Sequence, residues 1–349
     1  MAGRSARKEN RGNNPTLYGT LVSGKARDYH TATSGRTKLP PFVASGGNID
    51  GATPGDGYVY HLFSSPGTFT IPAVRTPSTT FDVLLVGGGG AGGACDTSNG
   101  SGGGGGGGVV HHAQLDSSSP LAVTIGAGGA APTSNNVVGA NGSDSTLVSP
   151  TAPWTITAKG GGGGGHYGTN GNPGGSGGGG GGFGGSYSNV VTTGDQPGLN
   201  PTFSPDPNFN QYGNDGGAPT DSNPGNAGGG GGSATVGGSH PAAGGGPGAS
   251  AGGDGQPFPG FVGALPGFSP MPAPWINAVG PTGRYGAGGG GENPYNGGST
   301  TAGGAGGGGS GPAPNAIVNT GSGGGANDPA STAAGSGAEG ICIIRYAET

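Results

Sequence analysis

The fold is decided by the stretch FDVLLVGGGGAGGACDTSNGSGGGGGGG, which occupies residues 81–108. It begins with Phe81–Val86, a short apolar run whose composition predicts a strand. The run passes directly into Gly87–Gly90 and, after a polar break, into the seven glycines Gly102–Gly108. Because a strand opens into glycine, we expect the glycine to belong to the fold and not to a tether outside it.

The glycine run can be ordered only when other segments of the chain pack and hydrogen-bond against it. Seven glycines have no side chain to bury, and fixing their backbone costs on the order of 7–14 kcal/mol, whereas one hydrogen bond returns about 0.5–1.5 kcal/mol. An extended threefold helix points its N–H and C=O groups outward, so a bundle of such helices can bond on every side. Similar runs recur at 160–165, 177–182, 228–232, 288–291 and 306–309. We therefore predict a mostly irregular and β fold, a bundle of polyglycine-II helices flanked by short β-strands, with almost no α-helix.

Short apolar segments on either side of the glycine runs predict the strands. They are Tyr58–Phe63, Thr68–Ile71, Phe81–Val86, Val109–His111, Leu121–Ile125, Trp154–Thr157 and Ile341–Tyr346. Alternation in the last strand puts Ile341, Ile343 and Arg345 on one face and Cys342, Ile344 and Tyr346 on the other. Since both faces carry apolar residues, we expect this strand to be covered on both sides and to pair near Tyr58–Phe63 or Phe81–Val86.

Composition limits the class of protein. The 349 residues include 94 Gly and 31 Pro, and an apolar fraction of 29% is too low for an ordinary globular core of this length. We expect small apolar caps around a large hydrogen-bonded glycine interior. No apolar run is long enough to span a membrane, and no membrane insertion or signal region is expected. Cys95 and Cys342 make no disulfide framework; a bond between them stays an alternative to Cys342 as a small buried hydrophobe.

Charge separates the chain into two parts. Residues 1–40 carry a net charge of +6, and the remaining residues carry −11. We expect a basic, extended anchoring arm over residues 1–56 and a glycine-rich domain over 57–349. The arm is predicted to dock on other proteins of a larger particle; nucleic acid is the weaker alternative, because no aromatic residues interleave its basic tip. The anchoring candidates at that tip are Arg4, Arg7, Lys8 and Arg11.

Two insertions, at 183–226 and 254–285, combine aromatic residues with prolines that stiffen the backbone. Such loops can form a binding surface at low entropic cost. The alternative is that these aromatics cap the glycine bundle. Trp275 is the preferred contact residue, because Pro272 and Pro274 restrict the backbone beside it. The receptor-binding candidates are Trp275, Phe258, Phe261, Phe268, Tyr285, Phe203, Phe209 and Tyr212.

A series of blocks in a fixed order resembles a known family. The blocks are Gly67-Thr68-Phe69-Thr70-Ile71-Pro72, Asp82 to Gly90, Gly108-Val109-Val110, Val123 to Gly129, Asn141 to Ser145, Thr155 to Ala158 leading into Gly160–Gly165, and Gly340 to Tyr346. Together they are similar to the glycine-rich domain of bacteriophage tail fibres and adhesins. The resemblance implies a virion protein whose glycine runs pack as polyglycine-II helices and whose loops meet the host. Its expected partners are other virion proteins and a host surface glycan or outer-membrane protein.

No pattern of catalytic residues emerges. Matches to Gly-x-Gly-x-x-Gly carry no weight in a sequence this rich in glycine, and His111-His112 on a strand would point to opposite faces. We expect no enzyme, no metal and no cofactor. The leading hypothesis is a tail-fibre or adhesin component that attaches the particle to the host. Alternatives are a virion decoration or connector protein without host contact and, less favoured, an ice-binding protein; whether the chain forms a homo-oligomer is left open.

Overall fold

The computed structural model divides the chain into two units, Met1–Pro41 and Phe42–Thr349. The first unit lies outside the residues that the structure describes. In the second unit the structure describes residues 42–72, 80–96, 99–151, 154–182, 191–196, 200, 206–219, 226–239, 250–263, 265, 271–273, 276–277, 283–293, 299–310, 314–327 and 333–348. The account below concerns this second unit.

The glycine-rich body begins earlier than residue 57, where composition alone places it. Phe42 and Ala44 are buried in the core, Ser45 bridges to Thr70, and β1 (Ile49–Ala52) pairs with β2 (Tyr58–Phe63). The boundary at residue 56 is therefore corrected to Pro41. Residues 42–56 read as a polar linker because their few apolar residues are scattered, yet those residues fill places in a core made elsewhere.

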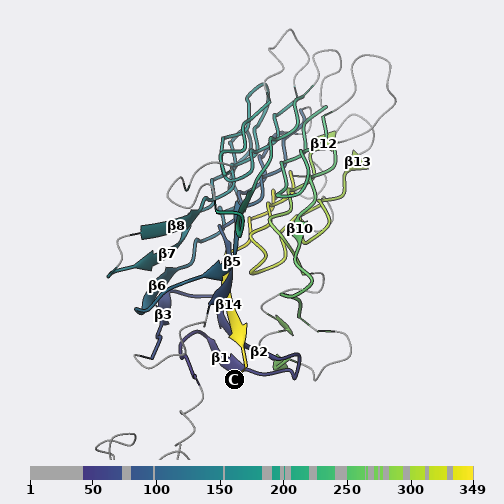
Figure 1. Cartoon of the computed structure of the whole chain (residues 1–349). Coiled ribbons are helices and arrows are strands. Elements are labelled where there is room, and N and C mark those ends of the chain that lie inside the picture. Colours follow the sequence, from purple (N-terminus) through teal and green to yellow (C-terminus); the bar gives the residue numbers. More distant parts are fainter. Residues whose placement is uncertain are drawn as a thin grey trace, which may run out of the picture. The chain divides into compact units, whose positions relative to one another are not determined.

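The larger sheet has the order β1-β2-β14-β4-β5-β9, and all of its pairings are antiparallel (Figure 1). Its remaining strands are β4 (Phe81–Val86), β5 (Val109–Leu115), β9 (Phe209–Tyr212) and β14 (Ile341–Ala347). The prediction that the C-terminal strand pairs with one of two earlier strands is confirmed, since β14 lies between β2 and β4. Ile343 faces Leu62 on one side and Leu84 on the other.

A second, four-stranded antiparallel sheet has the order β3-β6-β7-β8. Its strands are β3 (Gly67–Phe69), β6 (Leu121–Thr124), β7 (Ser145–Ser149) and β8 (Trp154–Ala158). Period-two alternation decides which side is buried, so Leu121 and Val123 point inward while Ala122 and Thr124 are exposed. The short strands β10 (Gln256–Pro257), β11 (Arg284–Tyr285), β12 (Glu292–Asn293) and β13 (Ser299–Thr300) form two small hairpins.

Two hydrophobic clusters cover the two faces of the six-stranded sheet. The first, called here the inter-sheet core, joins Cys342, Ile344 and Tyr346 to inward residues of the four-stranded sheet. The second, called here the insert core, joins Ile341 and Ile343 to side chains from the insert at 254–285. The expected alternation of β14 and its burial on both faces are confirmed. The sheet is thus the middle layer of three.

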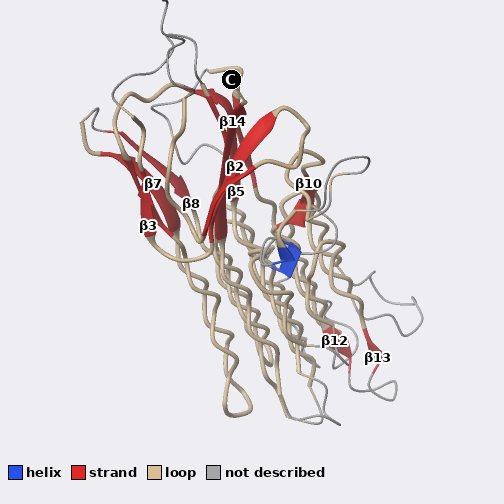
Figure 2. Ribbon diagram, turned by 90° about the horizontal axis from the view of Figure 1, so that it is seen from below, coloured by secondary structure: helices blue, strands red, loops and turns tan. Residues whose placement is uncertain are grey.

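The rest of the described body is built from glycine runs that cross-bond with a period of three. The amides of residues 102, 105 and 108 donate to the run 159–165, those of 103 and 106 to the run 228–231, and those of 104 and 107 to the run 321–324. Only a threefold extended helix aims every third N–H at the same neighbour. The predicted polyglycine-II helices are therefore present, and they appear as twisted extended runs below the sheets in Figure 2.

The run Gly102–Gly108 is the centre of this bundle. It also accepts hydrogen bonds from residues 87, 90 and 93, from residues 176 and 179, and from residue 289. Six runs therefore enclose it, the number expected for hexagonally packed rods. A Cβ atom added at any position from 102 to 107 would meet a backbone carbonyl oxygen of a neighbouring run, well inside van der Waals contact. Glycine is required here because the neighbours are backbone and cannot rotate away.

The two ends of the body differ in character. β14 begins at Ile341 opposite Val86, where β4 opens into glycine, and ends at Ala347 opposite Tyr58. The ring of Phe42 packs on Tyr346, with centroids 4.9 Å apart, so the chain enters the body at the end of the sheet away from the glycine bundle.

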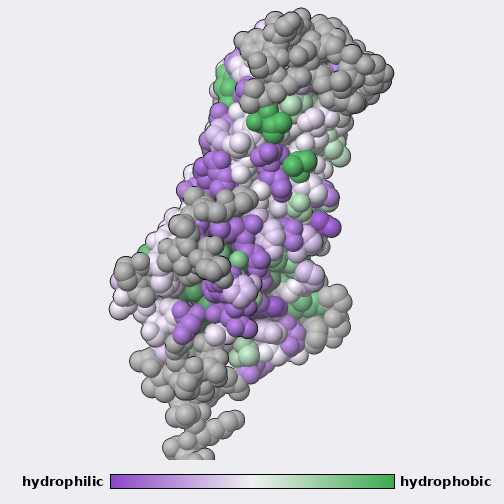
Figure 3. Space-filling view, turned by 45° about the horizontal axis from the view of Figure 1, so that its top comes forward, coloured by the Kyte–Doolittle hydropathy of each residue, from purple (hydrophilic) through white to green (hydrophobic). Residues whose placement is uncertain are grey.

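On the face shown in Figure 3, the described residues are mostly hydrophilic or neutral, and hydrophobic residues form only small separate patches.

Candidate functional site

The insert at 254–285 is tied down at its base. β10 and β11 pair antiparallel at its two ends, and the hydroxyl of Tyr285 donates to the carbonyl oxygen of Phe261 at 2.5 Å. Phe258, Phe261 and Tyr285 are only 7%, 2% and 0% exposed. These three receptor-binding candidates therefore lie in the insert core and form no exposed surface. They cover the outer face of the six-stranded sheet, which would otherwise lie open to water, and not the glycine bundle that the alternative named.

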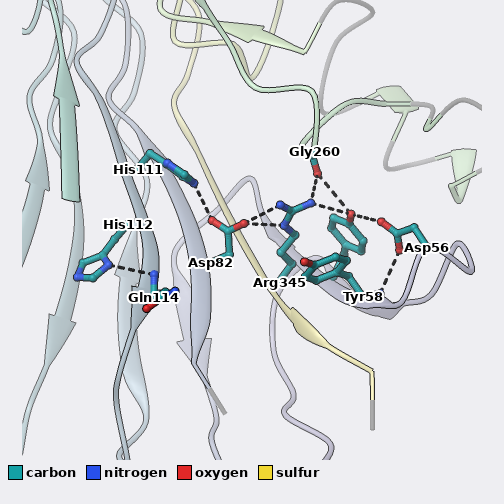
Figure 4. Close-up of polar contacts among 9 residues, drawn as sticks. Asp56, Tyr58, Asp82, His111, His112, Gln114, Gly260 and Arg345 are labelled. Carbon is teal, nitrogen blue, oxygen red and sulfur yellow. Dashed lines mark hydrogen bonds and ion pairs between the residues drawn. The ribbon is translucent and has the colours of Figure 1, made fainter. Parts of the chain in front are cut away.

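Arg345 of β14 clamps this insert to the sheet (Figure 4). Its Nε donates to Asp82 Oδ2 at 2.8 Å, and its Nη1 donates to the carbonyl oxygen of Gly260 at 3.0 Å. The guanidinium carbon lies 4.4 Å from the ring centroid of Tyr58 and 4.6 Å from that of Phe261. Contacts with both ring faces and with a carboxylate are what a desolvated guanidinium needs. The clamp thus joins β14, β4, β2 and the insert.

The electrostatics of the clamp are consistent with a charged arginine. Burial opposes its charge, but Asp82 and Tyr60 favour it more, and the pKa of Arg345 is raised above its ordinary value. Burial, together with a hydrogen bond to Asp56, also raises the pKa of Tyr60. Asp82 is shared, because its second oxygen lies 2.7 Å from His111 Nε2. The group is thus a connected polar network of Arg345, Asp82, His111, Tyr60 and Asp56.

Sequence reasoning placed Arg345 on a strand face but assigned it no role. The available signal was a single charge inside an otherwise apolar strand, ICIIRYA. A charge in a strand that is covered on both faces must find a partner. The identity of that partner, Asp82, followed only from the pairing of β14 with β4.

The outward part of the insert begins after Met271, which is itself buried. Pro272 and Ala273 are exposed, Ile276 is 39% exposed, and the amide of Ile276 bonds to the carbonyl oxygen of Pro272 at 3.2 Å. This helical turn presents an exposed aliphatic side chain. Trp275 and Phe268 lie outside the described residues.

The first insert contributes a strand. Phe209 and Tyr212 belong to β9, the edge strand beside β5. Phe209 packs against His112 with ring centroids 5.6 Å apart, and Tyr212 packs against Phe258 at 5.8 Å. Both candidates are partly buried and take part in the packing of the sheet. Phe203 lies outside the described residues.

Adjacent histidines in β5 point to opposite faces, as expected. His111 lies beside Phe258 in the insert core, whereas His112 lies beside Phe209 and Asp206. Within the described ranges no group of three His, Cys, Asp or Glu side chains is placed to hold a metal ion. No helix in those ranges is long and apolar enough to cross a membrane.

Cys95 and Cys342 are both buried and free, so the alternative of a disulfide between them is not realised. Burial raises the pKa of Cys95 to about 12. Its backbone exchanges two hydrogen bonds with the amide of Asn327, at 2.9 and 2.8 Å, and Ser101 donates to the same Asn327 side chain at 2.6 Å. This group joins the ends, distant from the sheets, of the three glycine runs that Cys95, Ser101 and Asn327 adjoin.

The anchoring candidates Arg4, Arg7, Lys8 and Arg11 lie outside the described residues.

Fold and contacts define a sheet-capped bundle of threefold glycine helices. A family model described as a glycine-rich domain matches residues 64–347. The chain belongs to this glycine-rich domain family, which accounts for the strand blocks and the glycine runs together. A search of curated proteins finds no match to the chain.

Proposed function

We propose that this protein is a structural component of a phage particle, of the tail-fibre or adhesin type, that attaches the particle to the surface of its host. The observation that carries the proposal is the enclosed run Gly102–Gly108, in which backbone alone bonds to six neighbours. Such a lattice offers no side-chain chemistry. It serves as a rigid scaffold, and recognition falls to the inserts and links that it holds.

Attachment further needs an anchor and a displayed surface. The basic arm offers the anchor, because its charge suits an acidic neighbour in the particle. The insert at 254–285 offers the surface, since the Arg345 clamp holds its base while Ile276 stays exposed. Trp275 neighbours Ile276 in sequence and stays the preferred contact residue. An aromatic with an aliphatic neighbour suits either a glycan or an outer-membrane protein.

Competition for adsorption tests this proposal. Purified full-length protein, added to host cells before the phage that carries it, is expected to reduce phage adsorption. Ile276→Asp and Trp275→Ala should each weaken this competition at least tenfold, because hot-spot losses exceed about 1.4 kcal/mol. Val236→Asp is the matched control, since Val236 is an exposed aliphatic side chain at 61% that lies outside both inserts.

The outcomes separate attachment from a purely structural role. If the wild-type protein does not compete, yet electron microscopy with antibody labels it on the particle, the protein is a connector or decoration. If all three variants compete like wild type, the insert is not the contact surface.

A further inference from the structure

Four asparagines of the chain are followed directly by glycine. They are Asn99, Asn141, Asn170 and Asn296. Glycine has no side chain to shield its backbone nitrogen, so in this pair the nitrogen can attack the side-chain carbonyl carbon of the asparagine before it. Asn296 lies outside the described residues. The hydrogen bonds around the other three pairs decide which of them can react.

The pair Asn141-Gly142 is held in the glycine bundle by three hydrogen bonds. The backbone N–H of Gly142 donates to the carbonyl oxygen of Gly161 at 2.9 Å. The side-chain oxygen of Asn141 accepts one bond from the N–H of Gly163 and one from the side-chain amide of Asn172, both at 2.9 Å. Asn141 is solvent-exposed all the same. Its attacking nitrogen and its side-chain carbonyl are therefore both restrained, although water reaches the side chain.

The pair Asn99-Gly100 is also restrained. The side-chain amide of Asn99 donates to Asp96 Oδ1 at 2.7 Å, and its backbone N–H donates to the carbonyl oxygen of Asp96 at 3.3 Å. The carbonyl oxygen of Gly100 accepts a bond from the N–H of Gly182 at 3.0 Å and one from the thiol of Cys95 at 3.3 Å. Asn99 is partly buried as well, so this pair has little freedom to bring its reacting atoms together.

The pair Asn170-Gly171 differs from both. It follows the turn that ends the run 160–165, and Asn170 is solvent-exposed. Within the described part of the chain, neither the side chain of Asn170 nor the backbone N–H of Gly171 makes a hydrogen bond. The lattice resumes at the next residue, where the N–H of Asn172 donates to the carbonyl oxygen of Gly163 at 2.8 Å. An unbonded nitrogen and an unbonded side-chain amide thus lie next to each other in the chain.

We propose that Asn170 is a site of spontaneous deamidation, at which the folded protein converts this side chain to aspartate and isoaspartate. The backbone nitrogen of Gly171 loses its proton to hydroxide, attacks Cγ of Asn170 and expels the side-chain nitrogen as ammonia. Water then opens the cyclic imide at either carbonyl carbon. The product carries one more negative charge, and isoaspartate adds one methylene to the backbone. The change falls beside Tyr167, whose N–H donates to Cys95 Sγ at 3.0 Å at the end of the bundle distant from the sheets.

Peptide mapping of the full-length protein after incubation at pH 8.0 and 37 °C tests this proposal. Chymotryptic peptides are separated, and fragmentation in the mass spectrometer locates each gain in mass. Deamidation at Asn170 should be at least about tenfold faster than at Asn141, which is about 1.4 kcal/mol in activation free energy, because Asn141-Gly142 must first give up its hydrogen bonds. Asn172 does not interfere, because Pro173 has no N–H to lose. The rate at Asn170 should rise with pH, since the deprotonated nitrogen is the nucleophile.

The unfolded protein is the matched control. In concentrated urea both sites are the same dipeptide without the lattice, so the ratio of their rates should fall close to one. Asn170→Gln should remove the fast gain in mass from its peptide, because glutamine would have to form a larger ring. A ratio below about tenfold in the folded protein would overturn the proposal. So would a fast gain in mass that persists in the same peptide of the Asn170→Gln protein.

Discussion

Gly105→Ala adds one methyl group at the centre of the glycine bundle. The new Cβ would meet the carbonyl oxygen of Ser176 and lie 2.7 and 2.8 Å from the carbonyl oxygen and carbon of Gly177. These are backbone atoms, so the whole neighbouring run must move. That run makes four backbone hydrogen bonds at this level: Ser176 N to Gly106 O at 2.9 Å, Gly162 N to Ser176 O at 2.9 Å, Gly177 N to Asn214 O at 3.0 Å, and Gly231 N to Gly177 O at 2.8 Å.

The cost of this movement can be estimated from its parts. Overpacking costs about 1–3 kcal/mol, and weakening four hydrogen bonds costs about 0.5–1.5 kcal/mol each. The free energy of unfolding should therefore fall by about 3–9 kcal/mol, a large share of the roughly 5–15 kcal/mol typical of a folded domain. Equilibrium unfolding in urea, followed by circular dichroism, measures the change.

Gly67→Ala provides the matched control. At Gly67 an added Cβ would meet only the ring edge of Phe63, at 3.2 Å, and a side chain can adjust where backbone cannot. We expect the control to lose less than about 1 kcal/mol. The lattice argument is refuted if Gly105→Ala unfolds within about 0.5 kcal/mol of the wild-type protein, or if the two variants are equally destabilised.

Three further predictions concern the arm, the clamp and pH. Deleting residues 1–41 should leave the melting temperature unchanged, whereas deleting 1–56 should lower it, because the second deletion removes Phe42 from the inter-sheet core and β1 from the sheet; equal melting of the two truncations would contradict the revised boundary. Arg345→Met should lower the free energy of unfolding by at most about 3–5 kcal/mol, the cost of breaking a fully buried pair, because Asp82 is 16% exposed and keeps His111 as a partner. Limited proteolysis should then cut the insert first, and Arg345→Lys should recover part of the loss. Burial lowers the folded-state pKa of three histidines, so the unfolded chain binds more protons below about pH 6.5. The free energy of unfolding should therefore be constant above that pH and should decrease as the pH falls below it. Urea unfolding at pH 8 and pH 5 measures this change, and a higher free energy of unfolding at pH 5 would contradict the prediction. The three histidines are His61, His112 and His166.

Local sequence was sufficient for seven of the ten strands in the two main sheets and for the type of helix. It did not predict β1, β7 or β9, which have few apolar residues. Tyr58–Phe63 and Phe81–Val86 have in the structure the same bounds that their composition predicts, and the C-terminal strand extends by one residue. Apolar and β-branched side chains carry this information in a few adjacent residues. Glycine runs of six or seven residues admit one ordered use, a backbone lattice, so threefold helices were predictable as well. The two faces of β14 followed from alternation alone.

Tertiary structure alone decided which runs are neighbours and which aromatics are buried. A glycine run has no side-chain pattern, so the sequence of Gly102–Gly108 does not predict which six runs surround it. The strands and links at the run ends set those neighbours. In the sequence, Phe258, Phe261 and Tyr285 look like exposed contact residues, because they are aromatics in a proline-rich insert. They are buried only because the insert packs them against a face of the six-stranded sheet that nothing else covers. Likewise, Arg345 and Asp82 are 263 positions apart, and their ion pair exists because β14 lies beside β4.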